Sequence, residues 1–328
     1  MRLEDLSTPA LVVDAAVLAE NLATMAAHLP GTRLRPHVKA HKCTSLAKLQ
    51  RQYGHTAFCC ATVREAEGLA LAGLSDDILL ANEVLDVDRL ARLRHWPVTV
   101  AVDSPATILA AAQAGIQRVL IDVNVGLPRC GCAPEQAGEL AEEARRRGLE
   151  VRGVMGYEGH AVGVVDRGVR SELCQQAMER LLTAHRAVGG PIISAGGTGT
   201  FDLNRWATEI QAGSYALMDT QYASLCLPFR QALFVWATVI SVGNGYAVAD
   251  CGLKALGMDH GNPSIDGAHV LFCSDEHVTF SPSVMPRVGD KIRVWPAHVD
   301  PTVAYHSCMY VLEGETIVEA WPVDLRGW

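Results

Sequence analysis

Short apolar runs typical of buried strands alternate with helix-like segments over much of the chain. Eight runs occur between Arg33 and Asp219, at residues 34–38, 57–61, 78–81, 98–102, 118–123, 151–155, 191–195 and 214–218. Helical patterns fill residues 45–53, 63–72, 87–93, 106–114, 135–147 and 170–188, each long enough to connect parallel strands. Eight β/α units over about 190 residues predict an α/β fold with a closed, eight-stranded (β/α) barrel. The alternative, an open doubly wound sheet, requires a glycine-rich loop after the first strand, where this chain has Pro36, His37 and Lys39.

Beyond Pro228 the pattern changes to β-runs without helices between them, which predicts a second, all-β domain. The runs lie at residues 233–242, 246–250, 270–273, 291–295, 309–312 and 316–321. Residues 9–14 form a further apolar run that we expect to join this β domain, with residues 15–28 as a helix leading into the barrel. The predicted domains are therefore a barrel at 15–227 and a β domain at 228–328 together with 1–14.

The composition is that of a globular chain, with 328 residues, 49% of them hydrophobic and 20% charged. The net charge of -8 and the lack of long basic runs argue against nucleic acid as a partner. Charged residues interrupt the N-terminal segment, so no signal peptide is expected, and the longest apolar stretch, residues 232–242, is too short to span a membrane. The ten cysteines form no disulfide framework, which favours reduced thiols and a cytoplasmic location.

Barrel enzymes carry their active sites at the carboxyl ends of the strands, and the first strand ends at a lysine. Lys39 follows the apolar run at 34–38, and Lys42 lies close by in the sequence. Burial and a neighbouring cation favour a lysine that reacts with carbonyl groups, so Lys39 is the candidate Schiff-base lysine.

Small residues follow the seventh and eighth runs, where barrels commonly bind a phosphate group. The first loop contains Gly197 and Thr198, and the second contains Gly213, Ser214 and Tyr215. Backbone N–H groups and hydroxyls in such loops can converge on an anion.

The fifth and sixth runs supply the remaining candidates. Arg129 follows the fifth run as a permanent cation suited to an oxyanion or phenolate, and Tyr157 and His160 follow the sixth. A lysine, an arginine, an aromatic ring and a phosphate loop at one barrel face together describe a site for pyridoxal 5′-phosphate.

A candidate metal pair lies near the C-terminus, in the segment that contains His298 and Asp300. In an extended segment, residues two apart share a face, so the imidazole and the carboxylate can bind one ion. The oxygen donor of Asp300 favours Mn²⁺ or Mg²⁺, with Zn²⁺ as the alternative.

These motifs resemble the D-threonine aldolase and D-serine dehydratase family, fold-type III pyridoxal enzymes related to alanine racemase. The resemblance covers nearly the whole chain and rests on five segments in the same order: 36–42, 122–131, 156–160, 196–199 and 250–254.

The resemblance implies roles for the candidate residues. Lys39 would bind the cofactor covalently, Arg129 would lie near its phenolate oxygen and Tyr157 would line its ring. Thr198, Gly213 and Ser214 would hold its phosphate, and we include the adjacent Gly197 and Tyr215 in the cofactor site. In the family the metal pair is His-x-Asp in aldolases and His-x-Cys in D-serine dehydratases, so His298 and Asp300 favour an aldolase. The resemblance also implies a head-to-tail homodimer.

The expected activity is that of a lyase that cleaves D-β-hydroxy amino acids to glycine and an aldehyde, with His160 or a hydroxide on the metal as the base. The alternative is a dehydratase of D-serine or D-threo-3-hydroxyaspartate that releases a keto acid and ammonia. Two further alternatives are a pyridoxal phosphate carrier without turnover, which the β domain argues against, and a hydrolase that uses only a metal.

Other polar residues are expected to be structural. The charged segment 275–277 resembles an acidic-histidine segment of the family, and the charges of a solvated loop explain it equally well. Cys130 and Cys251 are expected to pack in the interior. His37 and His41 flank Lys39 and could orient it.

Overall fold

The computed structural model describes residues 1–328, which form two compact units. The β unit comprises Met1–Thr24, Ala40–Ser45 and Ser214–Asp324, and the barrel unit comprises Met25–Lys39, Leu46–Gly213 and Leu325–Trp328. Residues 15–24 and 214–227, which the sequence assigned to the barrel domain, thus group with the β unit by their contacts.

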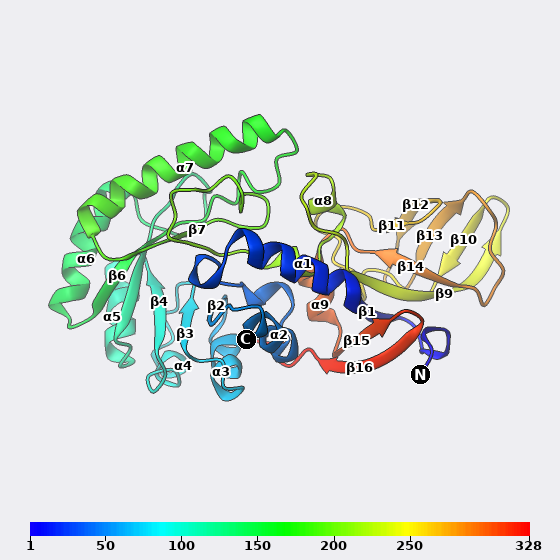
Figure 1. Ribbon diagram of the computed structural model, residues 1–328, viewed down its shortest axis with the longest axis horizontal. Coiled ribbons are helices and arrows are strands. Elements are labelled where there is room, and N and C mark those ends of the chain that lie inside the picture. Colours follow the sequence, from blue (N-terminus) through cyan, green and yellow to red (C-terminus); the bar gives the residue numbers. More distant parts are fainter. The chain divides into compact units, whose positions relative to one another are not determined.

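The core of the barrel unit is a sheet of seven parallel strands, paired in the order in which they occur in the chain (Figure 1). The strands are β2 (Ala57–Cys60), β3 (Asp77–Leu80), β4 (Val98–Val102), β5 (Arg118–Asp122), β6 (Glu150–Met155), β7 (Ile192–Ala195) and β8 (Glu209–Ile210). Their interior faces form an apolar cluster to which six strands contribute one residue each: Cys59, Leu79, Ala101, Leu120, Met155 and Ile192.

Residues 34–37 close this sheet, but they form single bridges instead of a regular first strand. Leu34 bridges to Ile210 of β8, and His37 bridges to Cys59 of β2, both in parallel. Pro36 has no N–H to donate, which limits the ladder, although its carbonyl accepts the N–H of Cys59. The prediction of an eight-membered α/β barrel is therefore confirmed, with an irregular first member.

The predicted eighth strand at 214–218 is wrong. Residues Ser214–Ala216 form the 3-10 helix η5, and the eighth strand is the shorter β8. The apolar run reflects burial of Tyr215 and its neighbours, and periodicity alone does not distinguish a short buried helix from a strand.

Helices follow the strands and cover the outside of the sheet (Figure 1). Ser104 caps its helix and Pro105 occupies the first turn, a combination that fixes the start of that helix. The helical elements of this part of the chain are η2 (Gly31–Arg33), η3 (Val38–Ala40), α2 (Thr44–Gln52), α3 (Val63–Leu71), α4 (Val87–Ala91), α5 (Pro105–Gln113), η4 (Pro134–Gln136), α6 (Ala137–Arg146) and α7 (Arg167–Val188).

A buried ionic network joins the amino ends of the strands. The guanidinium of Arg35 donates to Glu209 at 2.7 and 2.9 Å and to Asp77 at 2.9 Å, and Arg152 donates to the other oxygen of Asp77 at 2.9 Å. A buried guanidinium of this kind needs a charged partner, because removing that partner lowers the free energy of unfolding by about 3–5 kcal/mol. The network therefore stabilises the end of the barrel opposite the predicted site.

The β unit contains one nine-stranded sheet, which confirms the predicted all-β second domain. β9 also pairs with β10, so six of its strands close into an antiparallel barrel. As predicted, β1 belongs to this sheet, between β9 and β15. The strands are β1 (Ala10–Asp14), β9 (Leu233–Gly243), β10 (Tyr246–Ala249), β11 (Ser264–Ile265), β12 (Ala268–Cys273), β13 (Val278–Pro282), β14 (Lys291–Trp295), β15 (Cys308–Glu313) and β16 (Thr316–Pro322).

The β unit also contains helices, so the expectation of β-runs alone is wrong at one point. α9 (Val299–Tyr305) begins directly after His298, where the sequence suggested an extended segment. Proline at the third position of a helix needs no N–H partner, so Pro301 is compatible with this first turn. The remaining helices are η1 (Leu3–Asp5), α1 (Ala15–His28) and α8 (Thr220–Ala223).

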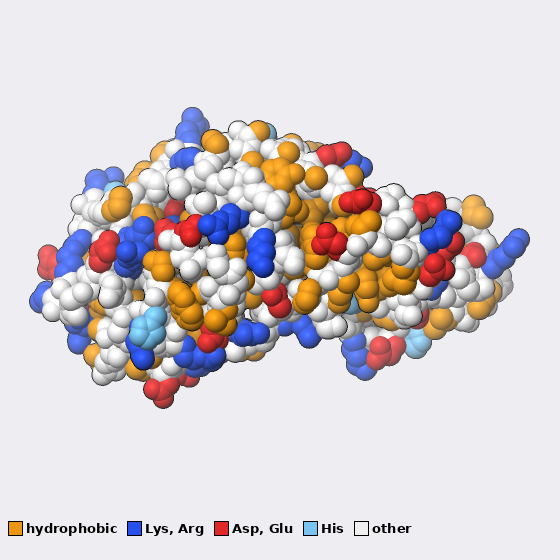
Figure 2. All heavy atoms as spheres, turned by 60° about the horizontal axis from the view of Figure 1, so that its bottom comes forward, with side chains coloured by type: hydrophobic (Ala, Val, Ile, Leu, Met, Phe, Trp, Pro, Cys, Tyr) orange, Lys and Arg blue, Asp and Glu red, His pale blue; other side chains and the backbone are white.

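No disulfide bond joins the ten cysteines. Cys251 is buried, as expected of a packing residue, whereas Cys130 is only half-buried, so the expectation that it packs in the interior is wrong. Burial raises the pKa of both thiols, that of Cys130 to about 11, so both remain protonated at neutral pH. None of the helices combines the length and apolar character that crossing a lipid bilayer requires. On the face drawn in Figure 2, basic and acidic side chains are interspersed and form no extended patch of one sign.

Candidate active site

Lys39 lies in η3, directly after the segment that closes the barrel. Its backbone N–H donates to Nδ1 of His37 at 3.5 Å, and the N–H of His37 donates to the carbonyl of Ala212 at 3.0 Å. These bonds tie the lysine segment to the loop that contains Gly213. Burial raises the pKa of the interior thiol of Cys59, and the charges of Arg35 and Lys39 act in the opposite direction, so Lys39 lies within electrostatic range of the barrel interior.

Arg129 and Tyr157 come together at the carboxyl ends of β5 and β6. The guanidinium carbon of Arg129 lies 5.2 Å from the centre of the Tyr157 ring, which is a cation–π distance. The two side chains line one small cavity with six others: Asp122, Val123, Asn124, Val125, Leu127 and Cys130. A guanidinium beside an aromatic ring suits a planar anionic group, although the cavity itself, about 10 Å³, holds no more than a water molecule.

An acidic pair lies beside this cavity. Burial raises the pKa of the Asp122 carboxyl well above its ordinary value, and the charge and hydrogen bond of Glu83 add to the effect. A nearby carboxylate and the lack of water both favour the neutral form of Asp122. A protonated Asp122 adds less negative charge beside Arg129 than a carboxylate would.

The glycine loop after β7, which we define as residues 196–204, packs tightly on the segment after β6. A Cβ atom on Gly197 would lie 3.2 Å from Val162 and 3.4 Å from the ring of Tyr157, and one on Gly199 would lie 1.8 Å from the carbonyl oxygen of Val162. Thr198, between these glycines, is 2% exposed. Only glycine allows this close approach of two backbones, which is the usual design of a phosphate cradle.

His160 lies near the loop after β5. A Cβ atom on Gly126 would be 2.8 Å from its ring, and Nδ1 is buried without a hydrogen-bond partner. A buried nitrogen of this kind is available to a bound ligand or water. The structure thus leaves His160 able to accept or donate a proton at Nδ1.

Ser214 and Tyr215 belong to the β unit, where both are buried in η5. The hydroxyl of Ser214 donates to Oδ1 of Asp300 at 3.3 Å, and the Tyr215 ring packs on Phe229. The predicted phosphate ligand Ser214 therefore contacts one of the two predicted metal ligands.

The β unit gathers three side chains that could hold a metal ion: Asp259, His260 and His298, whose ligand atoms all lie within 4.8 Å of one another. Oδ2 of Asp259 lies 2.7 Å from Nδ1 of His298, and the two imidazole rings stack with centroids 3.9 Å apart. Because a carboxylate only accepts hydrogen bonds, Nδ1 of His298 carries the proton and Nε2 is left to bind a metal.

Asp300 is outside this cluster, in the first turn of α9. The argument that paired it with His298 through an extended backbone is wrong, although the pairing itself stays a prediction. Nearby, Asp219 accepts the N–H groups of Tyr222 and Val299 at 2.9 and 3.0 Å, and burial raises its pKa to about 6.

The residues present fit both implied groups. The barrel unit offers a lysine, a cation–aromatic cavity and a close-packed glycine loop, and the β unit offers nitrogen and oxygen donors of the kind that bind divalent ions. Sequence reasoning missed Asp259 and His260 because they lie about forty residues from His298 in the chain, although their Asp-His-Gly turn is visible in the sequence. It also left Glu158 without a role.

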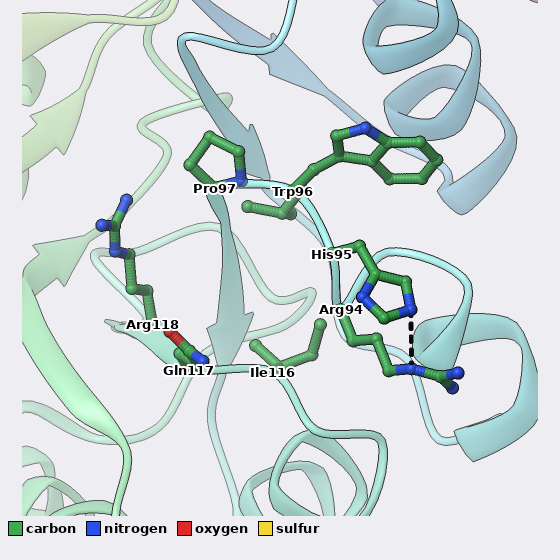
Figure 3. Close-up of a pocket in the computed structure, with 8 residues that line it drawn as sticks. Arg94, His95, Trp96, Pro97, Ile116, Gln117 and Arg118 are labelled. Atoms are coloured by element: carbon green, nitrogen blue, oxygen red, sulfur yellow. Dashed lines mark hydrogen bonds between the residues drawn. The ribbon is translucent and has the colours of Figure 1, made fainter.

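A further pocket lies at the opposite end of the barrel, before β4 and β5 (Figure 3). Nε of Arg94 donates to Nε2 of His95 at 3.1 Å there, and Trp96, Gln117 and Arg118 also line it. It contains none of the predicted site residues.

Two family models match the chain in sequence. The alanine racemase N-terminal domain matches residues 13–221, and the putative serine dehydratase domain matches residues 232–312.

Full-length relatives and solved structures are similar to the whole chain. A D-threonine aldolase from an Arthrobacter species is 34% identical over 98% of this chain and 93% of the relative, and the 3-hydroxy-D-aspartate aldolase of Paracoccus denitrificans strain Pd 1222 is 33% identical over the same shares. The crystal structure of D-threonine aldolase from Filomicrobium marinum has a TM-score of 0.94 and 33% identity, with 100% of this chain and 98% of that chain covered. The chain therefore belongs to the D-threonine aldolase and D-serine dehydratase-like family of fold-type III pyridoxal phosphate enzymes, whose members are lyases.

Proposed function

We propose that this protein is a D-threonine aldolase-like lyase that cleaves D-β-hydroxy amino acids to glycine and an aldehyde. The observation that carries the proposal is that two aldolases match 98% of the chain at 33–34% identity, whereas a D-threo-3-hydroxyaspartate dehydratase from Delftia matches at 27%. Asp300 supports the same choice, because the family resemblance implies an aspartate as the second metal ligand of the aldolases.

In this proposal most of the cofactor-binding residues belong to the barrel unit. Lys39 would bind the cofactor covalently, the Arg129 guanidinium would balance its phenolate charge and Tyr157 would line its ring. Gly197, Thr198 and Gly213 of the barrel unit would bind its phosphate, and the sequence assigns Ser214 and Tyr215 of the β unit to the same group. When bound, pyridoxal 5′-phosphate acts as an electron sink for a bond that breaks at the Cα atom of an amino acid.

His298 and Asp300 of the β unit would hold the metal. Asp259 fixes the proton of His298 at Nδ1, which leaves Nε2 as the nitrogen that would bind an ion. When bound, a divalent ion would supply Lewis-acid chemistry that lowers the pKa of a hydroxyl group. His160, whose Nδ1 atom is buried without a hydrogen-bond partner, would be the base that takes the β-hydroxyl proton of the substrate.

Loss of the β-hydroxyl proton, cleavage of the Cα–Cβ bond and return of one proton to the Cα atom convert D-threonine into acetaldehyde and glycine, with the atoms balanced and no oxidant required. The substrate is a small molecule, and we propose that manganese or magnesium is the natural ion, with zinc as the alternative. We also propose a cytoplasmic homodimer, which size-exclusion chromatography with light scattering would test.

The test is product analysis. Purified protein is loaded with pyridoxal 5′-phosphate and Mn²⁺ and given D-threonine, and glycine, acetaldehyde and 2-oxobutanoate are measured. Glycine and acetaldehyde in equal amounts support the aldolase.

Dehydration is the second candidate, and the full-length similarity to the Delftia dehydratase favours it over other reactions. In that reaction Lys39 would remove the Cα proton, the β-hydroxyl would leave as water, and one water molecule would hydrolyse the resulting enamine. The products of D-threonine are then 2-oxobutanoate and ammonia, so the same experiment separates the two reactions.

A further inference from the structure

Glu158 is a fully buried carboxylate around which the glycine loop is folded. Its Oε2 atom accepts the N–H of Gly196 at 3.0 Å. Its Oε1 atom accepts the hydroxyl of Thr200 at 2.9 Å and the side-chain amide of Asn204 at 3.1 Å. One side chain from the segment after β6 thus holds three separate points of the loop after β7.

Through the hydroxyl of Thr200, Glu158 also positions Gly197. The hydroxyl that donates to Glu158 also accepts the N–H of Gly197 at 3.2 Å. Gly196 and Gly197 immediately precede Thr198, and Thr200 follows it closely, so the carboxylate fixes the backbone on both sides of Thr198. Cys174 of α7 lies behind the carboxylate, with its thiol 3.8 Å from Oε1.

The loop has little freedom to find another arrangement. Gly196 has a φ of +86°, a left-handed conformation that other residues rarely adopt, and a Cβ atom on Gly199 would lie 1.8 Å from a backbone oxygen. A loop packed this closely cannot move so that its N–H and hydroxyl groups find other hydrogen-bond acceptors. Its shape therefore depends on the acceptors that Glu158 supplies.

We propose that Glu158 is a positioning residue for the phosphate group of the cofactor. It does not contact the phosphate, which a carboxylate would repel, but it aligns the loop residues around Thr198 that bind it. The inference rests on the proposed function, because it requires this loop to bind the phosphate of pyridoxal 5′-phosphate.

The substitution Glu158→Gln tests this with almost no change in shape. A carboxylate accepts at both oxygens, whereas an amide replaces one of them with an NH₂ donor. That NH₂ group must face the N–H of Gly196 or the donors of Thr200 and Asn204, so at least one loop bond is lost.

The readout is the affinity of the apo protein for two ligands, pyridoxal 5′-phosphate and pyridoxal, which lacks the phosphate. Both are titrated by their absorbance. Glu158→Gln should weaken binding of the phosphate form by about tenfold or more, the usual effect of losing a hydrogen bond to a charged group, and leave pyridoxal binding unchanged. The change in the ratio of the two dissociation constants is the signature of a role in phosphate binding.

Glu209→Gln is the matched control. Glu209 is also buried, and it accepts from Arg35 and Ser194 in the network at the other end of the barrel. Its loss should lower the Tm and leave the ratio of dissociation constants as in the wild type.

Thr200→Val is the second variant, because it removes only the hydroxyl that links Glu158 to the N–H of Gly197. Thr200→Val should shift the ratio of the two dissociation constants in the same direction as Glu158→Gln. If Glu158→Gln does not fold, this variant tests the role in phosphate binding by itself. An unchanged ratio in the folded variants, or an equal loss of affinity for both ligands, overturns the inference while the proposed function stands. A wild-type protein that binds neither ligand overturns the proposed function itself.

Discussion

Oδ2 of Asp259 lies 2.7 Å from Nδ1 of His298, and this contact determines which nitrogen of the imidazole faces a metal ion. In metal sites a carboxylate that accepts the outer N–H of a histidine fixes the ring orientation and raises the basicity of the other nitrogen. The predicted ligand His298 is thus already oriented before any ion binds.

The first prediction concerns this contact. Asp259→Asn should weaken Mn²⁺ binding by about 10–100-fold, because a neutral amide supports the imidazole less well than a carboxylate. Isothermal titration calorimetry with MnCl₂ measures the affinity. Asp275→Asn, at an exposed acid of the same unit, is the control and should bind as the wild type does. Equal affinities in all three proteins would refute the role of Asp259.

The second prediction concerns Asp300. Asp300→Ala should leave the visible absorption band of bound pyridoxal phosphate intact and abolish cleavage of the β-hydroxy substrate, because the metal and not the cofactor is lost. Absorbance and product assays on one sample check both points. Undiminished activity without added metal would rule out Asp300 as a ligand.

The third prediction concerns the glycine loop. Gly199→Ala should displace the loop, because its Cβ atom would lie 1.8 Å from the carbonyl oxygen of Val162, and neither backbone can yield cheaply. We expect at least about a tenfold loss of pyridoxal phosphate affinity, as for the loss of a hydrogen bond to a charged group. Gly54→Ala has open space around it and serves as the control for folding and affinity, with a small cost from its positive φ of 99°.

The fourth prediction is a dependence of stability on pH. Burial alone would raise the pKa of Asp77, but the charge and hydrogen bond of Arg35, with those of Arg152, lower it below its ordinary value of 3.8. A depressed carboxyl pKa stabilises the folded state above the unfolded value and loses this effect as the pH falls through the folded value. Asp77→Asn should therefore lower the free energy of unfolding by about 2 kcal/mol at pH 7, and the difference from the wild type should shrink below about pH 4. Urea unfolding of both proteins at pH 7 and at pH 3 measures this difference. A difference that grows on acidification would contradict the lowered pKa of Asp77.

Much of the fold could be predicted because strands and helices differ in hydrophobic period. The barrel strand at Val98–Val102 and, in the β unit, the strand at Lys291–Trp295 have the predicted bounds, and so does the helix at Ala15–His28. β8 was missed because a strand of two residues has no period, and its polar Glu209 is buried only through Arg35, a partner far away in the sequence.

Part of the candidate site could also be predicted from the apolar runs of the sequence. Lys39, Arg129 and Tyr157 each follow an apolar run, and the carboxyl ends of parallel strands share one end of a barrel. The contact of Asp259 with His298 depends on the folding of the β unit, and no local pattern encodes it. The role of Glu158 could not be predicted, because it depends on donors from the later loop at 196–204.

The most direct test of the central claim is a visible spectrum followed by product analysis, with Lys39→Ala as the comparison. The wild-type protein loaded with pyridoxal 5′-phosphate should absorb in the visible range and, with D-threonine and Mn²⁺, release glycine and acetaldehyde, while Lys39→Ala should do neither. Release of 2-oxobutanoate would identify a dehydratase instead. A wild-type protein that shows no such absorbance after loading would contradict the account from Lys39 onward.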